Sequence, residues 1–143
     1  MSGATVVQNG RAKAYRPLPV EARRSAYDAA LAAYERGDFF EAHELLEPAW
    51  MGTDALAERA LYQGLIKLAA AFVHGVRGNP KGIAKNLVGA RDHLTAAIGS
   101  EPAATSGLDV VALVGAIDER LARLAADPTD ASIDPPALPR TTQ

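Results

Sequence analysis

The stretch from residue 55 to residue 77 reads ALAERALYQGLIKLAAAFVHGVR. At 100° per residue, apolar side chains cover most of its circumference, which predicts a central helix. A narrow polar stripe interrupts this surface at Gln63, Lys67 and His74, with Ala70 and Ala71 between them. Such a stripe either faces water or meets polar partners inside the protein. The alanines would let another helix approach closely along it.

Four further helices are expected around this one, over about residues 20–36, 39–51, 80–99 and 108–126. Asp38 is a suitable N-cap for the helix over residues 39–51, and Asn79 followed by Pro80 is a suitable start for the helix over residues 80–99. The connections are short, so neighbouring helices should be antiparallel. The predicted fold class is all-α, a compact bundle of about five antiparallel-connected helices with a flexible N-terminal arm and a C-terminal tail.

The chain has 143 residues, about the length of one domain. Residues 1–19 are polar and contain two prolines, so they are expected to form a flexible arm. Residues 20–126 hold the helical domain. Residues 127–143 are rich in proline, aspartate and threonine, which predicts a disordered Pro-rich tail.

The composition excludes several classes of function. No cysteine is present, so disulfides, zinc–thiolate sites, iron–sulfur clusters and thiol catalysis are ruled out. The net charge of −2 gives no general attraction for nucleic acid or for an anionic membrane, and neither partner is expected. The longest apolar stretch, around residues 65–76, is too short to span a bilayer. A cytoplasmic location is the expectation.

The second predicted helix carries an unusual group of side chains. Within an arc of about 100° it places three aromatic and two titratable residues: Phe39, Phe40, His43, Glu47 and Trp50. If the aromatic residues bury this face, His43 and Glu47 are buried with them and must find polar partners. Glu44 lies at the edge of the arc, and Lys67 of the central helix is a plausible partner for either glutamate. Pro48 should kink or shorten the helix.

Two segments together resemble a known family. They read FFEAHELLEPAW at residues 39–50 and ALYQGLIKLAAAFVHGVRGNPKGIAKNLVGARDHL at residues 60–94. The pattern is similar to that of the bacterial and archaeal domain-of-unknown-function family numbered 309, over about residues 37–94. The resemblance implies a small all-helical bundle and implies no activity. Pro48 departs from the family pattern, in which a helix-forming residue is more usual.

The first functional hypothesis is a small-ligand or catalytic pocket between the second and third predicted helices. The candidate residues are Phe40, His43, Glu44, Glu47, Trp50, Gln63, Lys67, His74 and Asn79. A desolvated carboxyl or imidazole beside an opposite charge can have a pKa suited to acid–base chemistry. The alternative is a closed hydrogen-bond network that fixes helix register. His93 lies off the core stripe of its helix and is interpreted as a surface residue.

Two other hypotheses use the same region. Residues 43–47, HELLE, resemble the zinc-binding HExxH pattern with glutamate in place of the second histidine, so His43, Glu47 and His74 could hold a divalent metal for a metal-dependent enzyme. No other cofactor is expected. Residues 20–53 carry seven acids against three bases, and residues 64–98 carry five bases against one acid. This asymmetry would suit a homo-oligomeric interaction module, with Trp50 as an exposed anchor. The residues identify neither a substrate nor a reaction.

Overall fold

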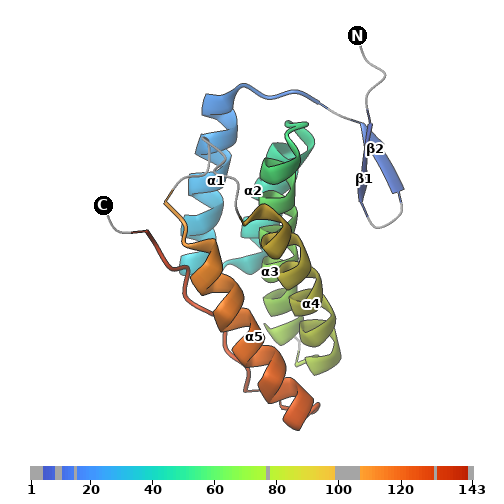
Figure 1. Cartoon of the computed structure of the whole chain (residues 1–143), viewed down its shortest axis with the longest axis vertical. Helices are drawn as coiled ribbons and strands as arrows, with labels where there is room; N and C mark the ends of the chain where they lie inside the picture. Colours follow the sequence, from blue (N-terminus) through green and yellow to red (C-terminus); the bar gives the residue numbers. More distant parts are fainter. Residues whose placement is uncertain are drawn as a thin grey trace.

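The computed structural model describes residues 5–8, 11–14, 16–76, 78–98, 107–130 and 132–141. Successive helices of the described part pack against one another, which confirms the predicted all-α bundle (Figure 1). The helices are α1 (Val20–Glu35), α2 (Phe39–Met51), α3 (Leu56–Val76), α4 (Pro80–Ala97) and α5 (Val110–Ala126).

The helix boundaries follow the capping signals of the sequence. The side chain of Asp38 accepts a hydrogen bond from the backbone N–H of Glu41 at 3.2 Å, and Asn79 does the same for Gly82 at 3.2 Å. Both caps satisfy an N–H that has no partner inside its helix, so both N-cap predictions are confirmed. Gly37 follows α1 with φ of 85°, a backbone conformation that glycine adopts without strain.

Helix α3 lies at the centre, with buried side chains on several faces. These are Leu61, Tyr62, Leu65, Ile66, Leu68, Ala69, Ala71 and Phe72. A Cβ atom at Gly64 would lie 2.6 Å from Cγ of Leu94, so only glycine lets α4 approach this closely. The prediction of a central helix over this stretch is confirmed.

The buried face of α2 differs from the one expected. The residues it buries are Ala42, Leu46, Ala49 and Trp50. Phe40, expected on the buried aromatic face, is 63% exposed. The two alanines have small side chains, so the side of α2 that carries them can lie close to the neighbouring helices. This side is buried, and Phe40 on the other side is left in solvent. Helix α2 also continues through Pro48 to Met51.

The N-terminal segment holds a short hairpin of β1 (Thr5–Gln8) and β2 (Arg11–Ala14), paired antiparallel with Thr5 opposite Ala14. The sequence between the two strands is Asn-Gly, a strong hairpin signal that the expectation of a flexible arm overlooked.

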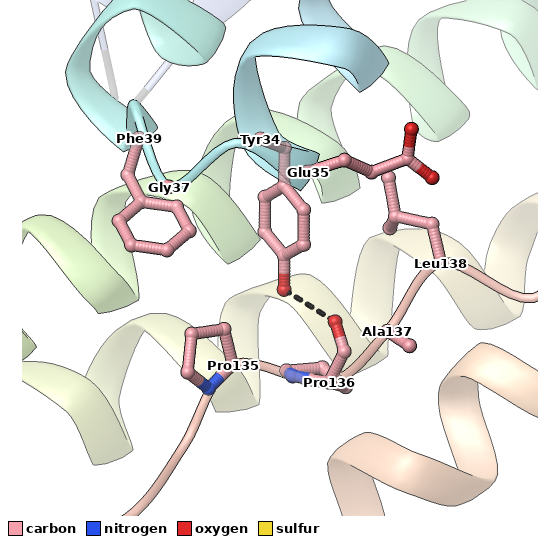
Figure 2. A pocket seen from close by; sticks show the side chains of 8 residues that line it. All are labelled: Tyr34, Glu35, Gly37, Phe39, Pro135, Pro136, Ala137 and Leu138. Carbon is pink, nitrogen blue, oxygen red and sulfur yellow. Dashed lines mark hydrogen bonds between the residues drawn. The ribbon is translucent and has the colours of Figure 1, made fainter.

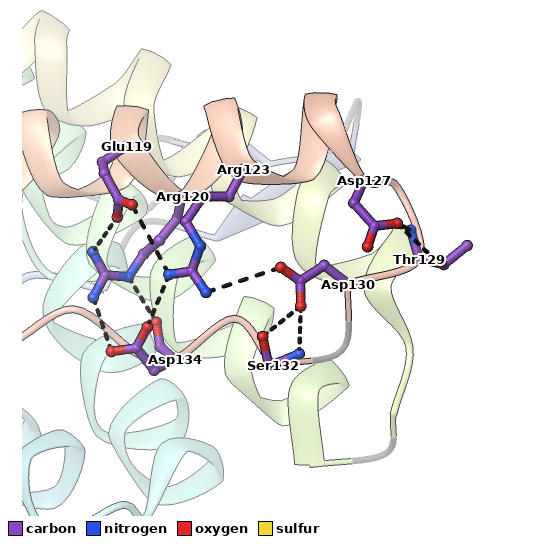
Figure 3. A network of polar contacts seen from close by, with 8 residues as sticks. All are labelled: Glu119, Arg120, Arg123, Asp127, Thr129, Asp130, Ser132 and Asp134. Carbon is purple, nitrogen blue, oxygen red and sulfur yellow. Dashed lines mark hydrogen bonds and ion pairs between the residues drawn. The ribbon is translucent and has the colours of Figure 1, made fainter.

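The C-terminal segment of residues 132–141, here called the strap, packs on the bundle instead of forming the expected disordered tail. Ile133, Pro136 and Leu138 are buried. The strap begins beside the end of α5, where Arg120 donates from Nε to the carbonyl oxygen of Asp134 at 2.7 Å (Figure 3). Further along, the backbone N–H of Asp109 donates to the carbonyl oxygen of Pro139 at 2.9 Å, so the strap runs antiparallel to α5. Burial of its few apolar side chains stabilises the strap on the bundle, although the overall composition of residues 127–143 is polar.

Across the part of the chain that the structure describes, no helix combines the length and apolar character needed to cross a membrane.

Candidate functional site

Four of the predicted site residues lie together on α2. Phe40, His43, Glu44 and Glu47 follow the spacing i, i+3, i+4 and i+7, which places them on one side of a helix. Phe40 and Glu44 are exposed, and His43 and Glu47 are half-buried. We call this surface the α2 outer face. It is a surface of the protein, whereas the first hypothesis from the sequence was a pocket between α2 and α3.

His43 has the most distinctive environment on the α2 outer face. Its Nδ1 atom is buried and makes no hydrogen bond within the described residues, yet it lies 3.4 Å from Oε2 of Glu44. The rest of the side chain is accessible, with 29% of its area exposed. A carboxylate this close to Nδ1 resembles the arrangement behind histidines that bind a ligand through Nε2.

Lys67 lies against α4. Its Cγ and Cδ atoms would be 3.4 Å and 3.5 Å from a Cβ atom at Gly89, so its stem crosses α4 where that helix has no side chain. Burial lowers the pKa of Lys67, and the neighbouring charge of Lys85 lowers it further. The side chain of His93, one turn beyond Gly89, is half-buried, which corrects its interpretation as a surface residue.

His93 gives the folded protein a pH dependence. Burial lowers the pKa of its imidazole, and the charge of Lys67 adds to this effect while Asp92 opposes it. The unfolded chain therefore binds this proton more readily than the folded chain. Stability should fall as the pH drops through about 6.5, the ordinary pKa of histidine, and level off below the folded pKa.

Thermal melts of the wild type and of a His93→Gln variant between pH 8 and pH 5 test this expectation. The difference between the two melting temperatures isolates His93 from the other titrating groups. We expect the wild type to lose more stability towards pH 5 than the variant, and parallel curves would contradict the assignment.

The principal buried polar network of the described residues is one that the sequence did not predict. Glu58, in the first turn of α3, is 4% exposed. Its Oε1 accepts a hydrogen bond from the Thr53 hydroxyl at 2.7 Å and lies 3.3 Å from Nε of Arg23 on α1. Its Oε2 accepts a hydrogen bond from the Tyr62 hydroxyl at 3.1 Å.

This Glu58 network is suited to a structural role. Burial raises the pKa of the Tyr62 hydroxyl, and the charge of Glu58 and their hydrogen bond raise it further, so Tyr62 remains a neutral donor. Arg23 also donates to the carbonyl oxygen of Leu18, which ties the entry to α1 to the start of α3. An acidic residue in the first turn of a helix is common, so nothing in the sequence singled out Glu58. Its pairing with Arg23 is visible only in the folded structure.

The remaining candidates lie elsewhere. Trp50 is 2% exposed and fills the core, with the Arg59 guanidinium 5.6 Å from its ring centroid, so the hypothesis of an exposed tryptophan anchor is wrong. Gln63 is buried on α3. Asn79 is exposed and caps α4. The side chain of His74 lies outside the described residues.

Metal ligation depends on which side chains come together. Among the described side chains, no group of three or more histidine, aspartate or glutamate residues is arranged to hold a metal ion. The set predicted from the sequence was His43, Glu47 and His74, and its third member lies outside that description. The metal hypothesis therefore stays a prediction.

A separate pocket of about 330 Å³ opens where α1 turns into α2 (Figure 2). Its walls come from Tyr34, Glu35, Gly37 and Phe39 on one side and from residues 135–138 of the strap on the other. Tyr34 donates from its hydroxyl to the carbonyl oxygen of Pro136 at 2.8 Å. The rings of Tyr34 and Phe39 meet edge to face, 5.2 Å apart. No pocket was predicted here from the sequence.

The comparison with family models matches residues 27–86 to the family described as Domain of unknown function (DUF309). This segment is therefore similar to the DUF309 family. The match confirms the resemblance drawn from the sequence, and the DUF309 segment runs from within α1 to within α4. It includes the α2 outer face and Thr53, Glu58 and Tyr62 of the Glu58 network, whereas Arg23, α5 and the strap lie beyond it. Comparison with curated proteins and with solved structures finds no match.

Proposed function

We propose that this domain binds a small cationic ligand on the α2 outer face. The observation that carries the proposal is the environment of His43, whose buried Nδ1 lies 3.4 Å from Oε2 of Glu44 without a hydrogen bond. A carboxylate beside one imidazole nitrogen is the arrangement that holds ligand-binding histidines with the other nitrogen toward the ligand.

The chemistry of the neighbouring side chains favours a cation. Glu44 and Glu47 supply two carboxylates on the same side of α2, and the exposed ring of Phe40 supplies an apolar surface with a negative face. A primary or quaternary amine is attracted to both kinds of group. The sequence of α2 contains no lysine or arginine, and Arg36, which precedes the helix, pairs with Glu41 at 3.1 Å.

A divalent metal ion is the second candidate. Nε2 of His43 and the carboxylate of Glu47 are ligand types that zinc accepts, and the pairing of His43 with Glu44 matches the carboxylate–histidine arrangement that supports metal ligands. His74 would be the third ligand. In that case the domain would be metal-dependent, and hydrolysis would be the reaction to assay.

The test uses the histidine rings, of which the chain has three. Ring signals would be followed by NMR during separate titrations with Zn²⁺ and with a short aliphatic diamine, with His43→Asn used for assignment. We expect the His43 signal to move at lower ligand concentration than the His93 signal. Glu44→Gln should weaken binding about tenfold to a hundredfold.

Glu41→Gln is the matched control, because Glu41 is an exposed acid of the same helix that lies off this face and pairs with Arg36. It should bind as the wild type does. A response to Zn²⁺ that EDTA reverses, with none to the diamine, assigns the metal. Equal responses of His43 and His93 to both ligands, or unchanged binding by His43→Asn, would overturn the proposal.

A further inference from the structure

The strap contacts the bundle with alternate residues. Pro136 and Leu138 are buried and Ala137 between them is exposed, while Arg140, which is exposed, forms an ion pair two residues beyond Leu138. A period of two is the signature of an extended peptide that presents one side to a surface. The strap therefore lies on the bundle in the way that an extended peptide lies in a recognition groove.

Three residues of the strap, two buried and one at the surface, each contact a different feature of the bundle. The carbonyl of Pro136 accepts a hydrogen bond from the buried Tyr34 hydroxyl at 2.8 Å. Leu138 closes an apolar hollow lined by Ala30, Leu31, Ala42, Leu46 and Leu65, which come from α1, α2 and α3. Arg140 donates from Nη2 to Oε2 of Glu35 at 3.0 Å.

The strap does not fill the groove in which it lies, that is, the bundle surface formed by Tyr34, Glu35, Phe39 and the apolar hollow. The pocket of about 330 Å³ remains between residues 135–138 and the wall formed by Tyr34 and Phe39 (Figure 2). A tyrosine and a phenylalanine beside prolines make the kind of surface on which proline-rich segments dock. The space would admit a side chain larger than Pro135 or Ala137.

We propose that this groove is a peptide-recognition site for an extended segment with the pattern Pro-x-Leu-x-Arg in a partner protein, and that the strap is its built-in competitor. The three anchors specify the partner's chemistry: a proline carbonyl for Tyr34, a leucine for the apolar hollow and a cation for Glu35. Because the strap occupies the site, the apparent affinity for the partner is the intrinsic affinity multiplied by the fraction of molecules in which the groove is open. This site is independent of the α2 outer face.

The experiment measures fluorescence anisotropy of a labelled synthetic peptide with the strap sequence SIDPPALPRTTQ, added to the full chain. Arg140→Glu repels Glu35 and opens the strap, and the exposed position of Arg140 should leave the fold intact. We expect this variant to bind the probe about twofold to fivefold more tightly than the wild type does, the range of an exposed ion pair. Leu138→Ala should bind it at least about tenfold more tightly.

Thr141→Ser, at an exposed strap position outside the pocket lining, is the matched control and should bind as the wild type does. A probe with alanine in place of its leucine should not bind to any variant. If Arg140→Glu and Leu138→Ala both melt cooperatively and neither binds the probe, the strap is a fixed part of the core and the proposal is overturned. Light scattering that shows a dimer dissociated by the probe would assign the groove to the strap of a second copy and overturn the partner assignment.

Discussion

Replacing Glu58 with alanine is expected to cost about 3–5 kcal/mol of the free energy of unfolding, the range for breaking a buried ion pair on one side. Three groups lose their partner at once: the guanidinium of Arg23 and the hydroxyls of Thr53 and Tyr62. Arg23 is the costliest of these, since its side chain is only 17% exposed and would be left charged without its carboxylate. Urea denaturation followed by far-ultraviolet circular dichroism measures the loss.

Two further variants separate charge from hydrogen bonding. Glu58→Gln keeps one oxygen, which can accept from Thr53 or from Tyr62, so it should cost less than Glu58→Ala. The double variant Arg23→Ala/Glu58→Ala removes both charges and should be more stable than the sum of the two single losses predicts. Glu119→Ala, at an exposed acid of α5, is the matched control and should change stability by no more than about 0.5 kcal/mol. A loss below about 1 kcal/mol for Glu58→Ala would show that water replaces the carboxylate.

Replacing Trp50 with alanine should also cost about 3–5 kcal/mol, because it leaves a large cavity in the core. The ring is almost completely buried between α2 and its neighbours, and the nearby guanidinium of Arg59 would lose its aromatic surface. Circular dichroism is the appropriate probe, since Trp50 is the chain's single tryptophan and fluorescence would be lost with it.

Phe40→Ala is the control for Trp50→Ala. It removes an aromatic ring from the same helix, but from an exposed position, so stability should change by no more than about 0.5 kcal/mol. If Phe40→Ala were as destabilising as Trp50→Ala, the assignment of the buried face of α2 would be wrong.

The helices and their ends could be predicted from the sequence because their signals are local. Asp38 and Asn79 cap the helices that they precede, and each acts within three residues of its own position. The all-apolar surface of residues 55–77 likewise identified α3 as the central helix.

The side of α2 that faces the core could not be predicted from its aromatic residues. Burial of Ala42 and Ala49 reflects how closely the neighbouring helices approach, which is a property of the whole bundle. Glu58 was missed for a similar reason, since its distinguishing partner Arg23 belongs to another helix. The strap was missed because a proline-rich composition predicts disorder, whereas a few apolar residues with a matching groove are enough to order it.

The strap also sets the order in which the core can be completed. A chain is synthesised from its N-terminus, and domains begin to fold as they emerge. Leu138 closes a hollow formed by α1, α2 and α3, yet it is made after all of them. The nascent bundle must therefore keep that hollow open until Leu138 has been synthesised, and a messenger truncated before residue 132 would yield the described helices α1 to α5 with an unsealed core.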